Sequence, residues 1–163
     1  MSRNESDRED LMAEATALRR RVELQVPGEA ESVIAGFRDE GRISIYFGSD
    51  PVYHFDAQGR LRRAFVAGCL YRTGGTTLAR LTRERTDTTT TLVRHDLSQA
   101  DLQDFLIVMQ SRLQTLQEMI ETQQVAIVQQ VPADSLILPE FSTALSTILD
   151  TRMPLAEPIK GKP

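Results

Sequence analysis

The chain has 163 residues, a formal net charge of −4 at pH 7 and an isoelectric point near 5.2. With 40% hydrophobic and 26% charged residues it has the composition of a folded globular protein, and its length predicts one domain. A single cysteine, Cys69, excludes an intrachain disulfide and a cysteine-based metal cluster. The N-terminal residues are polar and carry no long apolar run, so we expect no membrane association and a cytoplasmic location.

Charge is distributed unevenly along the chain. Residues 32–94 carry ten arginines against six acidic side chains, whereas residues 1–31 and 95–163 are both net acidic. The three segments also differ in hydrophobic periodicity. We therefore divide one α+β domain, residues 1–153, into a helical arm at 1–31, a β-sheet at 32–94 and helices at 95–153.

The first segment is predicted to be a helix. Ser6-Asp7-Arg8-Glu9 has the spacing of a capping box. Apolar residues then recur at helical intervals at Leu11, Ala15, Leu18 and Val22. Arg19-Arg20-Arg21 fits the last turn, where basic side chains complement the helix dipole, and this interpretation is preferred to a nucleic-acid-binding arm. Pro27-Gly28 is the predicted stop.

The second segment has the pattern of an antiparallel meander of about six strands. Turn signals recur at Asp39-Glu40-Gly41, Gly48-Ser49-Asp50-Pro51, Asp56-Ala57-Gln58-Gly59, Thr73-Gly74-Gly75 and Thr86-Asp87. Between them apolar and polar residues alternate, as at Ile43, Ile45 and Phe47. Gly68 falls inside a single strand predicted from Arg60 to Arg72, where it would mark a bulge or bend.

The stretch from Tyr53 to Leu61 resembles one unit of the tyrosine-aspartate (Rhs-type) repeat. In that repeat an aromatic strand turns at Asp and Gly into an Arg-Leu strand. The resemblance covers residues 53–61 in a single copy, and it implies a hairpin at this place without carrying over a function.

A long amphipathic helix is predicted from Ser98 to Gln130. It opens with the capping box Ser98-Gln99-Ala100-Asp101, and its length would be about 48 Å. A small domain is only about 30 Å across, so we expect the first half to cover the sheet and the second half to meet other helices or a second subunit. The apolar stripe of this helix is too wide for a two-stranded zipper, and the positions that flank it carry too few charges. The helix-interface candidates are Leu113, Leu116, Met119, Ile120 and Ile127.

A further helix is predicted from Ser135 to Asp150, with Phe141, Leu145 and Ile148 on its apolar face. Residues 154–163, rich in proline, are expected to form a disordered tail.

Candidate chemistry is sparse. His54, His95 and Cys69 lack the spacings of metal sites, and a metal at His54, His95 and Asp96 or a Cys-His nucleophile pair is disfavoured. No P-loop, Rossmann fingerprint or nucleophile elbow is present in the sequence. We therefore predict no catalytic residue, cofactor or metal. The remaining candidates are arginines on the sheet, Arg60, Arg62, Arg63, Arg72, Arg83 and Arg85, which could bind anions or nucleic acid. Their simpler interpretation is a solvated sheet face.

The sequence favours a non-enzymatic assembly protein, a homo-oligomer formed through its amphipathic helices or a partner of another protein. The first alternative is binding of nucleic acid or another anion by the arginine-rich sheet face, with nucleic acid not favoured at this low isoelectric point. The second alternative is a small ligand bound between the sheet and the long helix.

Overall fold

The computed structural model describes residues 3–157 and confirms the α+β class with one antiparallel sheet. The sheet has nine strands rather than about six. In chain order the elements are α1 (Arg3–Ala17), β1 (Arg20–Gln25), β2 (Val33–Phe37), the 3₁₀ turn η1 (Asp39–Gly41), β3 (Ile43–Phe47), β4 (Val52–Phe55), β5 (Leu61–Val66), β6 (Cys69–Gly74), β7 (Thr77–Arg85), β8 (Thr90–Asp96), α2 (Gln99–Glu121), β9 (Ala126–Val131) and α3 (Ile137–Asp150).

Strands β1 to β8 form a continuous meander, and β9 returns to the far side of β1. The spatial order is β8-β7-β6-β5-β4-β3-β2-β1-β9, and every paired neighbour is antiparallel. The turn signals at residues 48–51, 56–59 and 86–87 fall between consecutive strands, as expected. Hairpin connections of this length make sequence neighbours into sheet neighbours.

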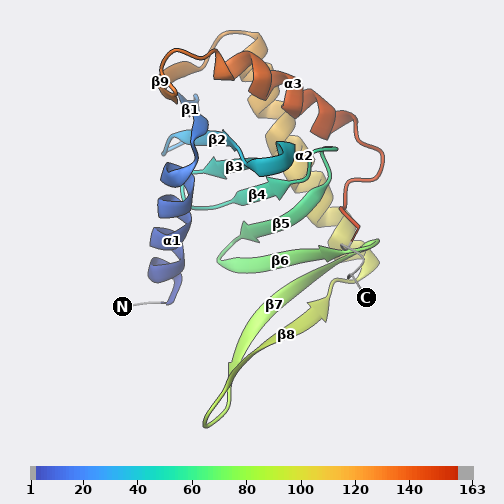
Figure 1. The fold of residues 1–163 in the computed structure, drawn as a ribbon. Coiled ribbons are helices and arrows are strands. Elements are labelled where there is room, and N and C mark those ends of the chain that lie inside the picture. The colour runs from blue at the N-terminus through green and yellow to red at the C-terminus, as the bar shows by residue number, and fades with distance from the viewer. Residues whose placement is uncertain (1–2, 158–163) are drawn as a thin grey trace.

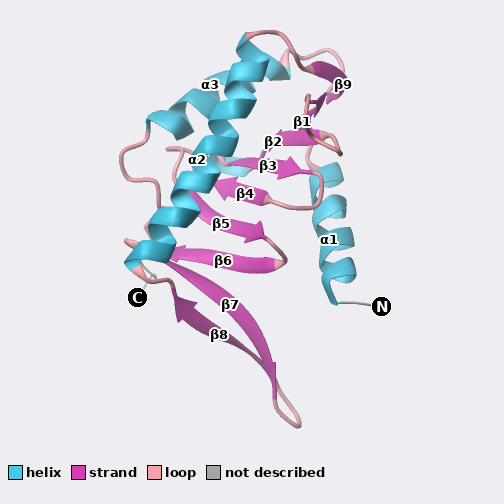
Figure 2. Cartoon of the chain, turned by 180° about the vertical axis from the view of Figure 1, so that it is seen from behind, coloured by secondary structure: helices cyan, strands magenta, loops and turns pink. Residues whose placement is uncertain are grey.

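Helices lie on both faces of the sheet (Figures 1 and 2). On one face α2 and α3 cover the larger core, which includes Met109, Leu113, Phe141 and Leu145 packed against inward-facing strand residues. On the other face α1 covers a smaller cluster formed by Ala15, Leu18, Ile34, Tyr46 and Val52. The β7–β8 hairpin projects beyond the helices at one end of the sheet.

The helical arm predicted at 1–31 is wrong beyond Ala17. Residues 20–25 form β1, which lies between β2 and the edge strand β9 and pairs with both. Val22, Leu24 and Val26 are all buried. Their period of two is the pattern of a strand with one buried face, and it outweighs the helical spacing that links Leu18 to Val22. Arg19-Arg20-Arg21 therefore enters a strand instead of closing a helix.

The long helix is also shorter than predicted. Ser98 caps it as expected, since its hydroxyl accepts a hydrogen bond from the Asp101 amide at 3.1 Å. The helix ends at Glu121, so it is about 35 Å long. Gln123 has a positive φ of 59°, and the chain then turns into β9. The β-branched residues Val125, Ile127 and Val128 favour a strand, although Ile127 keeps heptad spacing from Ile120.

Gly68 lies in a turn, not within one long strand. Ala67 and Gly68 both have positive φ, 53° and 77°, and connect β5 to β6. Such a two-residue turn matches the twist of an antiparallel pair. The Asp50 carboxylate accepts hydrogen bonds from both of their backbone amides at 3.0 Å, which fixes the turn from outside the hairpin.

The C-terminal helix matches its prediction closely, and its apolar face is buried at Phe141, Leu145 and Ile148. The tail from residue 154 was predicted to be disordered, but its first residues pair with β5. Leu155 is buried and forms a parallel bridge with Leu61, with backbone hydrogen bonds on either side of it. Residues 158–163 lie outside the described residues.

Candidate arginine-lined site

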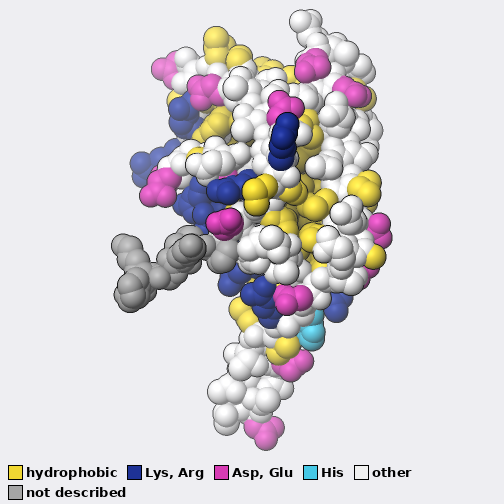
Figure 3. Space-filling model, turned by 90° about the vertical axis from the view of Figure 1, so that its right-hand side faces the viewer, with side chains coloured by type: hydrophobic (Ala, Val, Ile, Leu, Met, Phe, Trp, Pro, Cys, Tyr) yellow, Lys and Arg dark blue, Asp and Glu magenta, His cyan; other side chains and the backbone are white. Residues whose placement is uncertain are grey.

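The face of the sheet that carries α1 is only partly covered. Helix α1 packs on β2 to β5 through the cluster described above, in which Phe65 of β5 is the outermost member. Strands β6 to β8 have no helix on this face (Figure 1). Figure 3 looks at the right-hand side of Figure 1, so the α1 face is at its left, and most of the Lys and Arg side chains in that view lie toward this edge. The candidate site lies here.

Arginines converge on a hollow of about 480 Å³ at this face. Arg38 and Arg42 flank the η1 turn, Arg62 and Arg63 come from β5, and Arg72 comes from β6. The rest of the lining comprises His54, Phe55, Thr73, Ala156 and Glu157. Five guanidinium groups and one carboxylate therefore surround the space.

A β-bulge brings two consecutive arginines to the same hollow. His54 pairs with Arg63, but Phe55 pairs with Leu61, so Arg62 has no partner on β4. In a regular strand consecutive side chains point to opposite faces. The extra residue of a bulge bends the strand and redirects side chains, which allows Arg62 and Arg63 to line one space.

Arg63 and Arg72 are direct cross-strand partners on β5 and β6. Like charges placed directly opposite each other in a sheet are unfavourable. Arg63 is partly compensated by Glu14 at 3.5 Å. Among the described residues Arg42, Arg62 and Arg72 form no ion pair, although Arg42 Nε donates to the Asp39 carbonyl oxygen at 3.2 Å.

Glu14 of α1 is held at the edge of the site by two arginines. Its Oε1 accepts a hydrogen bond from Arg38 Nη1, whose guanidinium also lies 3.5 Å from Ser44 Oγ and Tyr46 Oη. Burial alone would raise the pKa of Glu14, but the Arg38 hydrogen bond and the nearby positive charges outweigh burial, and the pKa is lowered. Glu14 is therefore a carboxylate, and Arg38 is fixed toward the helix.

His54 is a neutral, buried donor without a partner. Burial, followed by the charge of Arg63, lowers its pKa to about 3. Nδ1 accepts hydrogen bonds from Arg63 Nε at 3.2 Å and Nη2 at 2.9 Å, so the proton of the neutral ring lies on Nε2. Nε2 is 3.8 Å from Glu14 Oε1, too far for a hydrogen bond, and it has no hydrogen-bond partner among the described residues. An unmatched buried donor is costly, and the Glu14 carboxylate is the acceptor group placed beside it.

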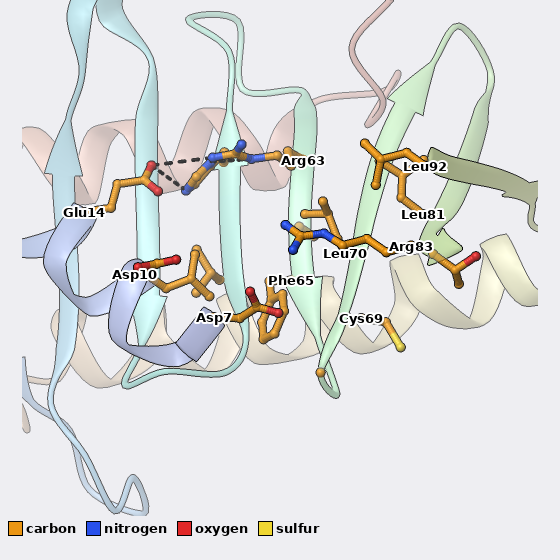
Figure 4. A pocket seen from close by; sticks show the side chains of 16 residues that line it. Asp7, Asp10, Glu14, Arg63, Phe65, Cys69, Leu70, Leu81, Arg83 and Leu92 are labelled. Carbon is orange, nitrogen blue, oxygen red and sulfur yellow. Dashed lines mark hydrogen bonds and ion pairs between the residues drawn. The ribbon is translucent and has the colours of Figure 1, made fainter. Parts of the chain in front are cut away.

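A second hollow, of about 470 Å³, adjoins the first and shares His54 and Arg63 with it. Asp7, Asp10 and Glu14 of α1 form its wall, and apolar side chains of β5 to β8 form its floor (Figure 4). Phe65, Leu70, Leu81 and Leu92 belong to that floor.

The predicted arginine set is only partly brought together. Arg62, Arg63 and Arg72 line the arginine hollow, and Arg83 lines the acidic one. Arg60 instead pairs with Asp56 at 3.1 Å inside the β4–β5 turn, where it is structural. Arg85 is exposed near the tip of the β7–β8 hairpin.

The helix-interface candidates do not form one surface. Leu113 and Leu116 are buried in the chain's own core, and Met119 and Ile120 pack against that core. Ile127 lies on β9, where 52% of it is exposed. The heptad-like stripe of α2 therefore packs on the sheet and α3 of the same chain.

Sequence reasoning missed Arg38 and Arg42. Both flank a turn that the sequence did indicate, Asp39-Glu40-Gly41, and the Arg38 amide donates to the Arg42 carbonyl at 2.7 Å across it. Arginines on both sides of a tight turn are necessarily close together, and this signal could have added them to the set.

The other chemical candidates remain apart. His54 lies on β4 and His95 on β8, where His95 Nε2 is 3.2 Å from Thr82 Oγ1. Among the side chains that the structure describes, residues 6–157, no three His, Cys, Asp or Glu are grouped as metal ligands would be. In the same residues no helix has the length and apolar character needed to cross a membrane.

Comparisons of the chain with protein-family models, with curated proteins and with solved structures find no match. The site's own geometry is therefore the basis for a functional proposal.

Proposed function

We propose that this protein is a non-enzymatic binding protein whose arginine hollow receives a compact anion with two or more phosphate or carboxylate groups. The observation that supports the proposal is the convergence on one hollow of Arg42, Arg62 and Arg72, which form no ion pair with the described residues. Two loop arginines and three strand arginines line this space, against one carboxylate of the described chain, Glu157.

The donors suit oxyanions. Guanidinium groups offer planar pairs of N–H donors that match phosphate and carboxylate oxygens, and charge-assisted hydrogen bonds are about twice as strong as neutral ones. His54 acts through Arg63, since its Nδ1 accepts hydrogen bonds from that guanidinium and helps to hold it in place.

The dimensions favour a small ligand over an extended polymer. About 480 Å³ lies within the usual range of small-molecule sites. The chain as a whole carries −4, and α1 places Asp7, Asp10 and Glu14 directly beside the arginines. A long polyanion crossing this face would meet those carboxylates, whereas a compact anion would not.

Calorimetric titration with inorganic pyrophosphate tests the proposal. We expect saturable binding that weakens as salt concentration rises, because the contacts are ionic. Arg62→Gln and Arg72→Gln should each lower the affinity about tenfold or more, the cost of one charged hydrogen-bonding group. Arg85→Gln, an arginine of the same sheet outside the hollow, is the matched control. No saturable binding by the unsubstituted protein, or equal binding by all variants, would refute the proposal.

A titration with single-stranded RNA at two salt concentrations separates the nucleic-acid alternative. Submicromolar, salt-sensitive binding that loses about one unit of salt slope per phosphate contact in Arg62→Gln/Arg63→Gln would establish that alternative instead. We expect only background binding.

Self-association is our second proposal, with β9 rather than α2 as its surface. β9 is one of the two edge strands of the sheet, contains no charged residue, and exposes Ile127 and Val128 by 52% and 54%. An uncharged apolar edge is prone to pair with another strand. Light scattering should give a mass above one chain that falls after Val128→Lys, and a monomer at high concentration would contradict it.

A further inference from the structure

The five arginines of the hollow fall into two groups according to their partners. Arg38 and Arg63 are both tied to Glu14 of α1, by a hydrogen bond from Arg38 Nη1 and by an ion pair of 3.5 Å from Arg63 Nη2. The other three arginines of the lining form no ion pair with the described residues. Two of the five positive charges are therefore partly neutralised before a ligand binds.

Glu14 acts on the arginine hollow from behind its wall. Its side chain lines the adjoining second hollow and not the arginine hollow, whereas Arg63 lines both. Figure 4 shows Glu14 reaching from α1 toward Arg63 at this boundary. The carboxylate therefore lowers the positive potential of the arginine hollow without filling space that a ligand would need.

The contacts of Arg63 direct its guanidinium toward α1. Its Nε and Nη2 atoms donate to His54 Nδ1 at 3.2 and 2.9 Å, and the same Nη2 forms the ion pair with Glu14. The donors of Nη1 remain for a ligand. The side chains of Glu14 and Arg38 are each 29% exposed, so water and salt screen this pair less than a pair on the open surface.

Helix α1 has contacts that hold it on the sheet without Glu14. Ala15 and Leu18 are buried in the smaller apolar cluster, and Arg8 pairs with Glu31 at 2.7 Å. We therefore expect a variant that lacks the Glu14 carboxylate to fold, and the charge at residue 14 can be changed separately from the packing of α1.

We propose that Glu14 is a built-in counter-anion that determines the charge of the ligand in the arginine hollow. This inference rests on the proposed function. Five guanidinium groups against two carboxylates, Glu14 behind the wall and Glu157 in the lining, leave three formal positive charges among the described residues. An anion of matching charge, of the pyrophosphate class, neutralises the hollow, whereas a more highly charged polyphosphate leaves excess negative charge near Glu14.

Calorimetry on the full chain with orthophosphate, pyrophosphate and tripolyphosphate tests this charge match. For the unsubstituted protein the affinity should rise from orthophosphate to pyrophosphate and gain about threefold or less from pyrophosphate to tripolyphosphate. Glu14→Gln should bind pyrophosphate about threefold or more tightly, because two guanidinium groups regain their full charge, and tripolyphosphate should gain more than pyrophosphate.

Two variants serve as controls. Asp10 lies one turn before Glu14 on the same face of α1 and belongs to no ion pair of the described residues, so Asp10→Asn should change the affinity for pyrophosphate about twofold or less. Glu14→Gln/Arg38→Gln removes one charge of each sign and should return the affinity to near that of the unsubstituted protein.

The outcomes separate this inference from the proposed function. Equal affinity for pyrophosphate in the unsubstituted protein and Glu14→Gln, or an equal gain in Asp10→Asn, would overturn the role of Glu14 and leave the anion site standing. Absence of binding of all three phosphates by the unsubstituted protein would overturn both. A steep rise from pyrophosphate to tripolyphosphate in the unsubstituted protein contradicts the charge match whether or not Glu14→Gln folds.

Discussion

Arg63 and Arg72 lie directly opposite each other on β5 and β6, and both side chains line the same hollow. A like-charged cross-strand pair destabilises a sheet unless something compensates it. Glu14 compensates Arg63 at 3.5 Å, whereas Arg72 is exposed and has no ion-pair partner among the described residues. An anion bound between the two side chains, as proposed above, would compensate this pair.

Replacing Arg72 should separate stability from binding. We expect Arg72→Thr to raise the free energy of unfolding by a few tenths of a kcal/mol, up to about 1, because a like-charge pair disappears and threonine suits a strand. The same variant should bind pyrophosphate more weakly. Urea unfolding and calorimetry measure the two effects, and a destabilised variant with unchanged binding would show that Arg72 is structural.

His54 should make stability depend on pH. Its pKa is lowered to about 3 in the folded chain, mainly by burial, from an ordinary value of 6.5. Between these values the unfolded chain binds more protons than the folded chain, so stability is full above pH 6.5 and falls as the pH drops toward 3. The lowered pKa of Glu14 adds a loss of stability at the acidic end.

Thermal unfolding followed from pH 7 to 4 measures this dependence. His54→Gln should make stability fall less steeply over that pH range, because the imidazole that the fold keeps neutral is gone. His95→Gln, an exposed histidine of β8, is the matched control for loss of an imidazole. An unchanged slope in His54→Gln would contradict the assignment of His54 as a buried neutral base.

The β5–β6 turn should tolerate, and benefit from, glycine at residue 67. Ala67 has a φ of 53°, a left-handed conformation that costs an L-residue about 1–2 kcal/mol. Ala67→Gly should therefore stabilise the fold, by about 1 kcal/mol or less after its greater unfolded-state entropy is included. Asp50→Ala should have the opposite effect because it leaves the amides of residues 67 and 68 without their acceptor.

Substitutions on α2 and β9 should distinguish core from surface. Leu116 is 2% exposed, so Leu116→Ala should cost about 2–5 kcal/mol of unfolding free energy. Ile127→Lys should change the stability of a single chain by about 0.5 kcal/mol or less, since the side chain is exposed. Chemical denaturation at low protein concentration checks both. A large cost for Ile127→Lys under those conditions would place residue 127 in the core.

Local signals in the sequence were sufficient for several elements. Gly, Asp and Pro clusters located the turns of the central meander, because these residues suit the required backbone angles. The Ser98 capping box located the start of α2, and the apolar face of residues 137–150 located α3. Each of these depends on interactions between residues close in the chain, which a sequence displays directly.

Only the tertiary structure decided the role of short segments and of the arginines. β1 and β9 are six-residue strands whose apolar spacing also fits a helix. They are strands because β1 pairs with β2 on one side and with β9 on the other. Arg38 and Arg42 join Arg62, Arg63 and Arg72 because β2–β3 and β5–β6 lie on either side of β4, and because a bulge turns Arg62 toward the hollow. Such a site depends on strand register and on contacts between distant segments. The spacing of residues along the chain does not show either of these before the chain is folded.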